Sequence, residues 1–219
     1  MMFVFMGTGL IVSYNQDKTR GGDLGAGLVS IAFGFGISLS TMIYTVANIS
    51  GGHLNPAVTI GLLTIRQIEL FKAIGYIACQ LGGGIVGTAL MYGVMPDNIT
   101  EQVYMGATRL AFGVTPAEGC ALEICLTFIL VFTVCATAEL SGDLKSMGRF
   151  APLAIGYSVL VDHMIGVPFT GASMNPARSF GPAVVGGYWL NHWVYWVGPI
   201  VGGILAAVLY HYLFIIEED

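Results

Sequence analysis

The chain has 219 residues, of which only 10% are charged, whereas about a quarter of the residues of a soluble domain usually are. Its mean hydropathy is +0.78 and its formal net charge is −5. The composition excludes a nucleic-acid-binding protein, because eight scattered basic residues form no basic surface, and it excludes a disordered chain. So few charges also argue against a soluble enzyme and indicate an integral membrane protein.

The first elements along the chain have unequal lengths. Residues 1–14 are apolar but fewer than the roughly 20 that cross a bilayer as a helix, so we expect the natural chain to continue upstream. Residues 24–65 form a run of 42 residues with no Asp, Glu, Lys or Arg. This run is too long for one crossing and has little polar sequence for a turn between two. It predicts one full span followed by a short apolar helix that begins after Asn55.

Ordinary spans follow, and then a second long run. Residues 73–96, 120–138 and 150–169 each predict one membrane helix. Residues 179–216 are again uncharged over 38 residues, which predicts a short helix after Asn175 and one more full span. Irregular backbone at this depth is tolerated only where it is buried in protein or lines a wet cavity. The two short helices therefore imply a water-filled path.

The chain repeats itself at a spacing of about 120 residues. Residues 50–57, Ser-Gly-Gly-His-Leu-Asn-Pro-Ala, match residues 170–177, Thr-Gly-Ala-Ser-Met-Asn-Pro-Ala. Residues 82–84, three glycines within a span, indicate close helix packing, and at a spacing of 119 two of them match the glycine pair at 202–203. Three spans per half is an odd number, so the second half enters from the opposite side.

We therefore expect an all-α membrane protein with six transmembrane helices and two re-entrant half-helices, arranged as an inverted 3+3 repeat. Residues 1–219 form a single channel domain, with a first repeat over 1–100 and a second over 115–219.

Both Asn-Pro-Ala tripeptides have the composition of helix starts, since Asn is a good N-cap and Pro is favoured at the first helical position. Inversion makes the two helix N-termini face each other in mid-membrane, and each carries about half a positive charge. This arrangement repels a cation and orients a neutral dipole such as water. The side-chain amides of the two asparagines would donate hydrogen bonds to that water, and carbonyl groups of the preceding extended segments would accept them. The motif residues are Asn55, Pro56, Ala57, Asn175, Pro176 and Ala177.

The doubled tripeptide, Arg178 directly after the second copy, and the flanking residues 50–54 and 170–174 resemble the aquaporin (major intrinsic protein) family over essentially the whole chain. Residues 170–184 are most similar to the classical water channels of animals. The resemblance implies a passive water channel that excludes protons and ions, with no enzymatic activity and no cofactor. It also implies a homotetramer in a lipid bilayer, most simply the plasma membrane. The carbonyl groups that line its path are expected from Gly51, Gly52, His53, Gly171, Ala172 and Ser173.

The family resemblance further implies an aromatic and arginine constriction, formed here by Phe35, His163, Ala172 and Arg178. Arg178 places a fixed cation and several donors in the wall, which repels protons and cations. The imidazole of His163 narrows the path and leaves little room for a carbon chain, and Ser179 stands where glycerol-conducting members tend to have Asp. These features favour water over glycerol. Phe33 is the alternative to Phe35 if the register shifts by two.

Three further positions carry expectations about support of the loops. Glu123 interrupts an apolar span, and we expect its carboxylate to brace the second loop. At a spacing of 119 its counterpart is Val4, which is not acidic, so bracing of the first loop is in doubt. Asp162 is unexpected within a span and receives no assignment. His53 either lines the path or makes a structural hydrogen bond.

Other motifs are weaker. Asn98 begins an Asn-Ile-Thr sequon in a polar stretch, which makes it a candidate for glycosylation in an extracellular loop. The four cysteines form no CxxC pair, lie in apolar stretches and are expected to be buried, and no metal site is expected.

The alternatives are a relative with the same fold that conducts glycerol or another small neutral solute, an ion channel, and an intramembrane serine hydrolase using Ser173 and His163. The hydrolase leaves the duplicated motif unexplained, and cations would have to pass Arg178.

Overall fold

The protein is built from helices and the loops that join them. The computed structural model describes residues 1–19, 24–139 and 149–214, and within these ranges it contains no strand. In chain order the elements are α1 (Met2–Thr19), α2 (Leu24–Ser50), α3 (Pro56–Thr64), α4 (Leu70–Val94), α5 (Asp97–Thr100), η1 (Glu101–Gly106), α6 (Pro116–Val134), η2 (Cys135–Glu139), α7 (Ala151–Gly166), α8 (Pro176–Gly186) and α9 (Val194–Leu213).

Six of these helices are apolar and of membrane type. Four are long enough to cross a bilayer: α2 from Gly27, α4, α6 with its extension to Thr137, and α9. Two are shorter, α7 and the Met2–Tyr14 part of α1. The expectation of an all-α membrane protein with six membrane helices and two additional short ones is confirmed.

The two long uncharged runs divide as predicted. In the first, α2 ends at Ser50, an irregular loop follows, and α3 is only nine residues long. In the second, α8 has 11 residues and is separated from α9 by a loop that begins at Gly187. Gly187 has a φ of 70°, a left-handed conformation that glycine adopts without the steric cost of a Cβ atom.

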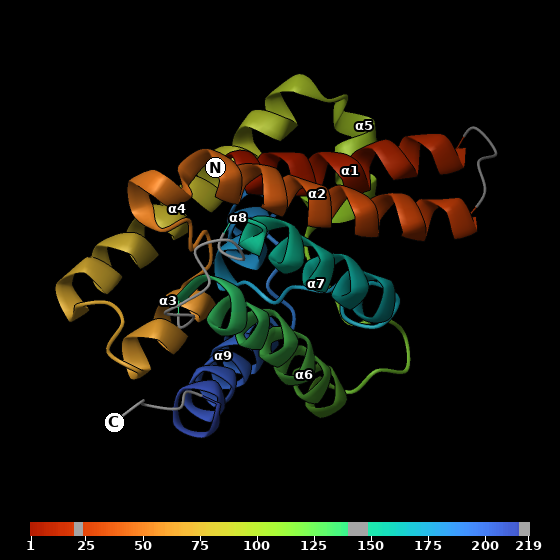
Figure 1. Cartoon of the computed structure of the whole chain (residues 1–219). Helices are drawn as coiled ribbons and strands as arrows, with labels where there is room; N and C mark the ends of the chain where they lie inside the picture. Colours follow the sequence, from red (N-terminus) through yellow and green to blue (C-terminus); the bar gives the residue numbers. More distant parts are fainter. Residues whose placement is uncertain (20–23, 140–148, 215–219) are drawn as a thin grey trace, which may run out of the picture.

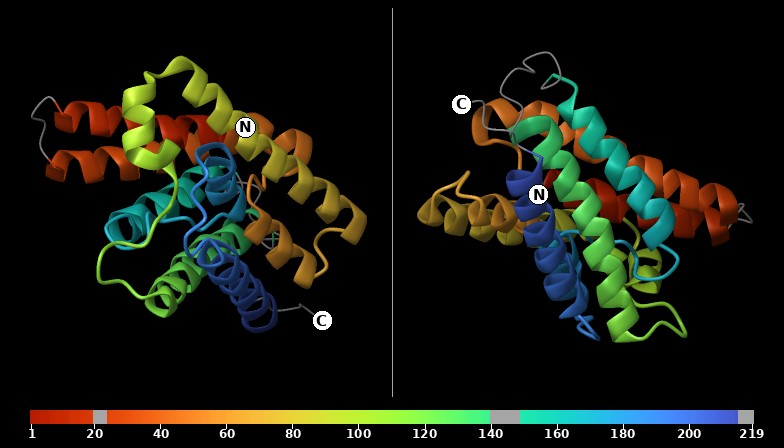
Figure 2. Two further views of the ribbon diagram at one scale, coloured as in Figure 1. Left: turned by 180° about the vertical axis from the view of Figure 1, so that it is seen from behind. Right: turned by 60° about the horizontal axis from the view of Figure 1, so that its bottom comes forward.

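The short helices occupy the middle of the helix bundle. Figure 1 shows α8 behind α7 near the centre, with α3 beside it, while α1 and α2 lie side by side above them. The main pairings are α6 with α9, α2 with α7, α4 with α8 and α3 with α9. Both views of Figure 2 show α6 and α9 running together along one side of the molecule. Each short helix is therefore enclosed by longer ones.

Glycines allow the backbones of α4 and α8 to touch. A Cβ atom added to Gly84 would lie 2.5 Å from the carbonyl oxygen of Ala177, and one added to Gly181 would collide with the carbonyl group of Gly84. The same holds on the other side, where a Cβ on Gly203 would lie 2.8 Å from the carbonyl oxygen of Ala57. Gly82 differs from the expectation, because nothing lies within 4 Å of its Cβ position.

This contrast within one helix makes a prediction. Gly84→Val should lower the free energy of unfolding in detergent by about 1–3 kcal/mol, because the new side chain has to push α8 away from α4. Gly82→Val is the matched control and should change it by less than about 0.5 kcal/mol. Denaturant titration of both purified variants provides the measurement. Equal effects would mean that the α4–α8 contact does not depend on Gly84.

Candidate functional site

Each short helix begins at an asparagine that caps it. Asn55 has extended backbone (φ −154°), and its Oδ1 accepts a hydrogen bond from the amide of Ala57 at 2.8 Å. Asn175 has the same conformation (φ −153°), and its Oδ1 accepts from the amides of Ala177 at 3.0 Å and Arg178 at 3.3 Å. A proline follows each asparagine at the first helical position, where its missing N–H costs nothing. Both tripeptides therefore start helices.

The two caps also bond across to each other's loops. The Nδ2 of Asn55 donates to the carbonyl oxygen of Met174 at 2.7 Å, and the Nδ2 of Asn175 donates to that of Leu54 at 3.0 Å. The N-termini of α3 and α8 therefore meet, as the inverted arrangement requires. Because a primary amide carries two N–H groups, each asparagine keeps one for another acceptor.

The loops before the asparagines have an unusual backbone. Positive φ angles recur at equivalent positions, 120 residues apart: Gly51, Gly52 and Leu54 in the first loop, and Gly171, Ala172 and Met174 in the second. Leu54 and Met174 are not glycines, and a left-handed conformation costs such residues about 1–2 kcal/mol. They are also the two residues whose carbonyl groups accept the asparagine amides. The cross-bonds thus involve two of the three non-glycine residues with left-handed backbone in these loops, and the third, Ala172, takes part in neither.

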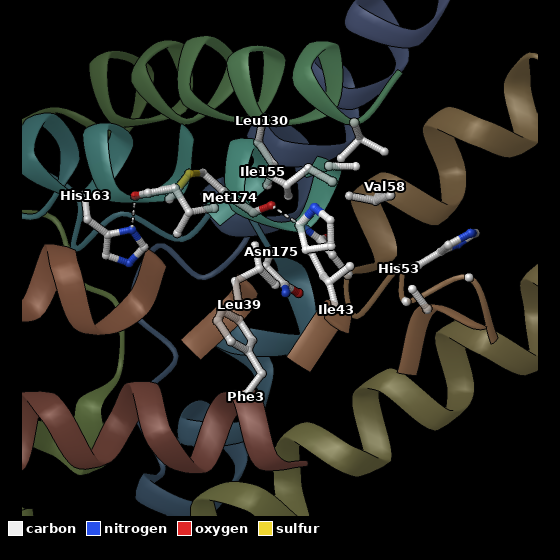
Figure 3. A pocket seen from close by; sticks show the side chains of 18 of the residues that line it. Phe3, Leu39, Ile43, His53, Val58, Leu130, Ile155, His163, Met174 and Asn175 are labelled. Carbon is white, nitrogen blue, oxygen red and sulfur yellow. Dashed lines mark hydrogen bonds between the residues drawn. The ribbon is translucent and has the colours of Figure 1, made fainter. Parts of the chain in front are cut away.

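A cavity of about 240 Å³ runs past both asparagines. Figure 3 shows Asn175 in its middle, His163 at one end and His53 toward the other. Leu39, Ile43, Leu130 and Ile155 are among the residues that make its walls largely apolar. Of the residues expected to supply carbonyl groups, Gly51, Gly52, His53 and Ser173 line this cavity, and Gly171 and Ala172 do not.

At the His163 end of the cavity, two rings and a guanidinium group lie close together. The rings of Phe35 and His163 stack with their centroids 4.2 Å apart, and the guanidinium carbon of Arg178 lies 5.1 Å from the centre of the Phe35 ring. Phe35 is 1% exposed, whereas Phe33 is 44% exposed and turned away from this group. The structure therefore brings together Phe35, His163 and Arg178, and it does not place Phe33 with them.

The hydrogen bonds of His163 and Arg178 determine which of their polar groups remain free to bind another molecule. The Nδ1 of His163 donates to the carbonyl oxygen of Val159 at 2.8 Å, since only a protonated nitrogen can bond a carbonyl, so the Nε2 of a neutral ring is an acceptor. This Nε2 has no partner among the described residues. Arg178 donates through Nη1 to the carbonyl oxygen of Gly106 at 2.8 Å and retains other N–H groups. The constriction thus combines one acceptor with a fixed cationic donor.

Ala172 lies behind this group. It is fully buried, and its Cβ would be 3.0 Å from a Cβ added to Gly166 at the end of α7. The amide of Ala172 donates a hydrogen bond to the hydroxyl oxygen of Thr170 in the same loop, at 3.2 Å. Its small side chain is what permits the close approach to α7.

Glu123 is the main support of the second loop. Its carboxylate is fully buried, and Oε1 accepts from the hydroxyl of Thr170 at 2.7 Å and from the amide of Ser173 at 2.9 Å. Its Oε2 accepts from the amide of Met174 at 2.8 Å. The carboxylate is thus paired with three donors. Val4, which lies 119 residues earlier, is buried and makes none of these bonds, but the contacts of α1 do not place it opposite Glu123: a Cβ on Gly83 would meet the backbone of Met1, whereas one on Gly202 would meet that of Ile124.

Two tyrosines, which sequence reasoning missed, hold the starts of the two loops. The hydroxyl of Tyr76 donates to the carbonyl oxygen of Ser50 at 2.8 Å, and that of Tyr195 donates to the carbonyl oxygen of Thr170 at 2.9 Å. The tyrosines are 119 residues apart and their acceptors are 120 residues apart, so a comparison of the two repeats could have identified this pair.

A second pair of contacts follows the same spacing. The Nδ1 of His53 lies 3.1 Å from the hydroxyl of Thr59, and the hydroxyl of Ser173 lies 2.5 Å from that of Ser179. His53 therefore both lines the cavity and makes a structural hydrogen bond, which joins the two roles that its sequence left open.

The remaining expectations have mixed outcomes. Asp162 is fully buried, and neither of its carboxyl oxygens has a partner among the described residues. The side chain of Asn98 lies outside the described part of the chain, so the sequon stays a prediction. The expectation of buried cysteines is wrong for Cys79 and Cys125, which are exposed, and right for Cys135, while Cys120 is only partly buried.

Comparison with known proteins gives matches over the whole chain. Residues 1–210 match the family model described as "Major intrinsic protein". The chain is 42% identical to aquaporin-4 of Mus musculus over 98% of its own length, and it spans 64% of the length of that relative. It is 40% identical to aquaporin-1 of Mus musculus, with 97% of the chain and 77% of that relative covered.

Similarity extends to a plant protein and to a solved structure. The chain is 44% identical to a probable aquaporin TIP-type of Medicago truncatula, over 98% of the chain and 83% of that relative. Its fold is similar to the X-ray structure of the aquaglyceroporin from Plasmodium falciparum, with a TM-score of 0.83, 24% identity, and coverage of 97% of this chain and 91% of that one. At this identity the structural likeness bears on the fold alone.

The buried carboxylate can be tested directly. Glu123→Gln should lower the free energy of unfolding by about 2–4 kcal/mol, because the amide keeps one acceptor oxygen and introduces N–H groups that face the loop's own donors. Glu118→Gln on the same helix is the control and should have little effect, since Gln also serves in a capping box with Thr115. Denaturant titration in detergent measures both. Indistinguishable variants would remove Glu123 as the support of the second loop.

Proposed function

Because the chain belongs to the major intrinsic protein family, which consists of transport channels rather than enzymes, we propose that it is a passive water channel that excludes protons and ions. The observation that carries this proposal is the cavity that runs past both asparagines and stops at the stacked Phe35 and His163 rings. The apolar helices make the chain a multi-pass membrane protein, so this cavity lies within the membrane.

The polar groups along the path suit water. Each asparagine has one amide N–H left after its cross-bond, and the carbonyl-bearing residues Gly51, Gly52 and Ser173 line the same cavity. A water molecule both accepts and donates, so it can exchange hydrogen bonds with these groups while the apolar walls hold it weakly. Such a path permits passage without tight binding.

The same groups oppose cations and protons. The N-termini of α3 and α8 meet in the middle of the path, and each carries about half a positive charge. Arg178 adds a full positive charge at the constriction, where it is 1% exposed. A cation therefore meets positive potential at two successive points, in surroundings that screen it poorly.

We extend the proposal to the assembly and its location on the resemblance to the family alone. The channel is a homotetramer in the lipid bilayer of the plasma membrane, and Asn98 is glycosylated on its outer side. Glycerol or another small neutral solute is the alternative permeant, and it is treated below as an outcome of the transport measurement.

Transport should separate water from glycerol. In proteoliposomes containing the purified chain, stopped-flow light scattering under a sucrose gradient should show shrinkage about tenfold or more faster than in protein-free vesicles. A glycerol gradient should produce the same rapid shrinkage with only slow reswelling, because the constriction at the stacked Phe35 and His163 rings is expected to be too narrow for a carbon chain. Rapid reswelling would instead assign glycerol as a permeant and reject water selectivity.

The constriction residues should control that selectivity. The double substitution His163→Ala and Arg178→Val removes one ring of the stack and the guanidinium group, so glycerol permeability should rise about tenfold or more while water still passes. Phe33→Ala alters an exposed ring outside this group and is the control. Unchanged glycerol exclusion in the double variant would show that the filter lies elsewhere.

A further inference from the structure

The guanidinium group of Arg178 is held by an acceptor that lies outside its own helix. Its Nη1 donates to the carbonyl oxygen of Gly106 at 2.8 Å, and Gly106 is the last residue of η1. The hydroxyl of Ser179, the next residue of α8, accepts a hydrogen bond from that of Thr108 at 2.8 Å. The segment that leaves η1 thus binds two consecutive residues in the first turn of α8. The position of Gly106 therefore determines where the cation of the constriction is fixed.

The chain reaches Gly106 through a turn with costly backbone conformations. Tyr104, Met105 and Gly106 have φ angles of 49°, 57° and 74°, so three left-handed residues follow one another. Such a conformation is costly for residues other than glycine and persists only where surrounding contacts impose it. Close packing surrounds the end of the turn, since a Cβ added to Gly106 would lie 3.1 Å from Thr8, and one added to Gly186 would lie 3.0 Å from Met105. The start of the turn, at Tyr104, is held by a different contact.

That contact is a stack in which Arg109 folds back over the turn. Its guanidinium carbon lies 4.1 Å from the ring centre of Tyr104 and 5.8 Å from that of Tyr188, and the two ring centres are 5.1 Å apart. Tyr188 directly follows Gly187, the residue that caps the end of α8. A cation is attracted to an aromatic face, and a planar guanidinium group also stacks on it. The stack therefore joins the start of the turn to the end of α8.

We propose that Arg109 and Tyr104 are positioning residues for selectivity, because their stack holds the left-handed turn whose last carbonyl group binds Arg178. Neither residue lines the cavity that runs past the two asparagines, so both act through Arg178. The effect on transport rests on the proposed water selectivity. The effect on the geometry of Arg178 does not, and it is measured separately.

NMR of the chain with nitrogen-labelled arginine reports that geometry without transport. The Nη signals of Arg178, identified by their loss in Arg178→Val, should be resolved in the wild-type chain because the bond to Gly106 slows rotation of the guanidinium group. Arg109→Lys and Tyr104→Ala each remove the stack and should shift or merge these signals. Tyr104→Phe is the matched control, since it keeps the ring, and it should leave them as in the wild-type chain.

Two outcomes of this measurement would overturn the proposal. One is an unchanged Arg178 signal in both Arg109→Lys and Tyr104→Ala, which would mean that the stack does not position the guanidinium group. The other is an equal change in Tyr104→Phe and Tyr104→Ala, which would mean that the aromatic ring is not the group responsible.

A double-mutant cycle connects the stack to selectivity. Arg109→Lys keeps the positive charge and loses the flat stacking group, and it should raise the glycerol permeability of proteoliposomes about threefold or more. In the Arg178→Val background the same substitution should add nothing, since the group that it positions is gone. An equal increase in both backgrounds, or wild-type permeability in Arg109→Lys, would contradict the proposal. If the wild-type chain itself passed glycerol rapidly, water selectivity would be rejected, and the Arg178 signals would still decide whether the stack positions this residue.

Discussion

A reciprocal pair of hydrogen bonds between the two short helices is the constraint on which the middle of the molecule depends. Asn55 bonds the carbonyl group before Asn175, and Asn175 bonds the one before Asn55. The two bonds hold both asparagine amides and both carbonyl groups in place where the N-termini of α3 and α8 meet. The left-handed backbone at Leu54 and Met174 presents the two carbonyl groups, and the bonds in turn maintain that strained backbone.

The surrounding structure keeps these two bonds aligned. Gly84 and Gly181 let α4 and α8 touch through their backbones, and Gly203 does the same for α9 and α3. Phe35 and His163 close one end of the path from α2 and α7, which pack together over much of their length. The helices thus fix the height and separation of the two helix N-termini, and the tyrosine and carboxylate bonds fix the loops that lead to them.

Much of this architecture can be predicted from the sequence, because it depends on the lengths of the uncharged runs and on the residues that start helices. Two uncharged runs that fit neither one crossing nor two predict the short helices, and the Asn-Pro pairs predict their starting points. Side-chain directions are harder, because a helix that is apolar all round carries no periodic mark of its inner face. Gly82 illustrates this, since it belongs to the same glycine run as Gly84 but faces away from other helices.

The hydrogen bonds of the two tyrosines to the loops could not be predicted from the sequence for a related reason. Tyr76 and Tyr195 lie in apolar helices, where a tyrosine is ordinarily a packing or interfacial residue. Only the comparison of two halves at a spacing of 119 gives them a shared role. Asp162 has no counterpart of this kind, and no hydrogen bond from a residue that the structure describes accounts for its burial.

Because the tautomer of His163 is fixed, the constriction has a hydrogen-bond acceptor on one side and donors on the other. With Nδ1 donating to the carbonyl group of Val159, the Nε2 of a neutral ring carries only a lone pair, while the guanidinium group of Arg178 carries only N–H donors. In the proposed channel, a molecule between them would be aligned, with a hydrogen toward the imidazole and its electron-rich atom toward the guanidinium group. The proposed channel would therefore select small solutes by their hydrogen-bonding groups as well as by their size: an ether or a ketone, which can only accept hydrogen bonds, would be matched by the guanidinium group alone.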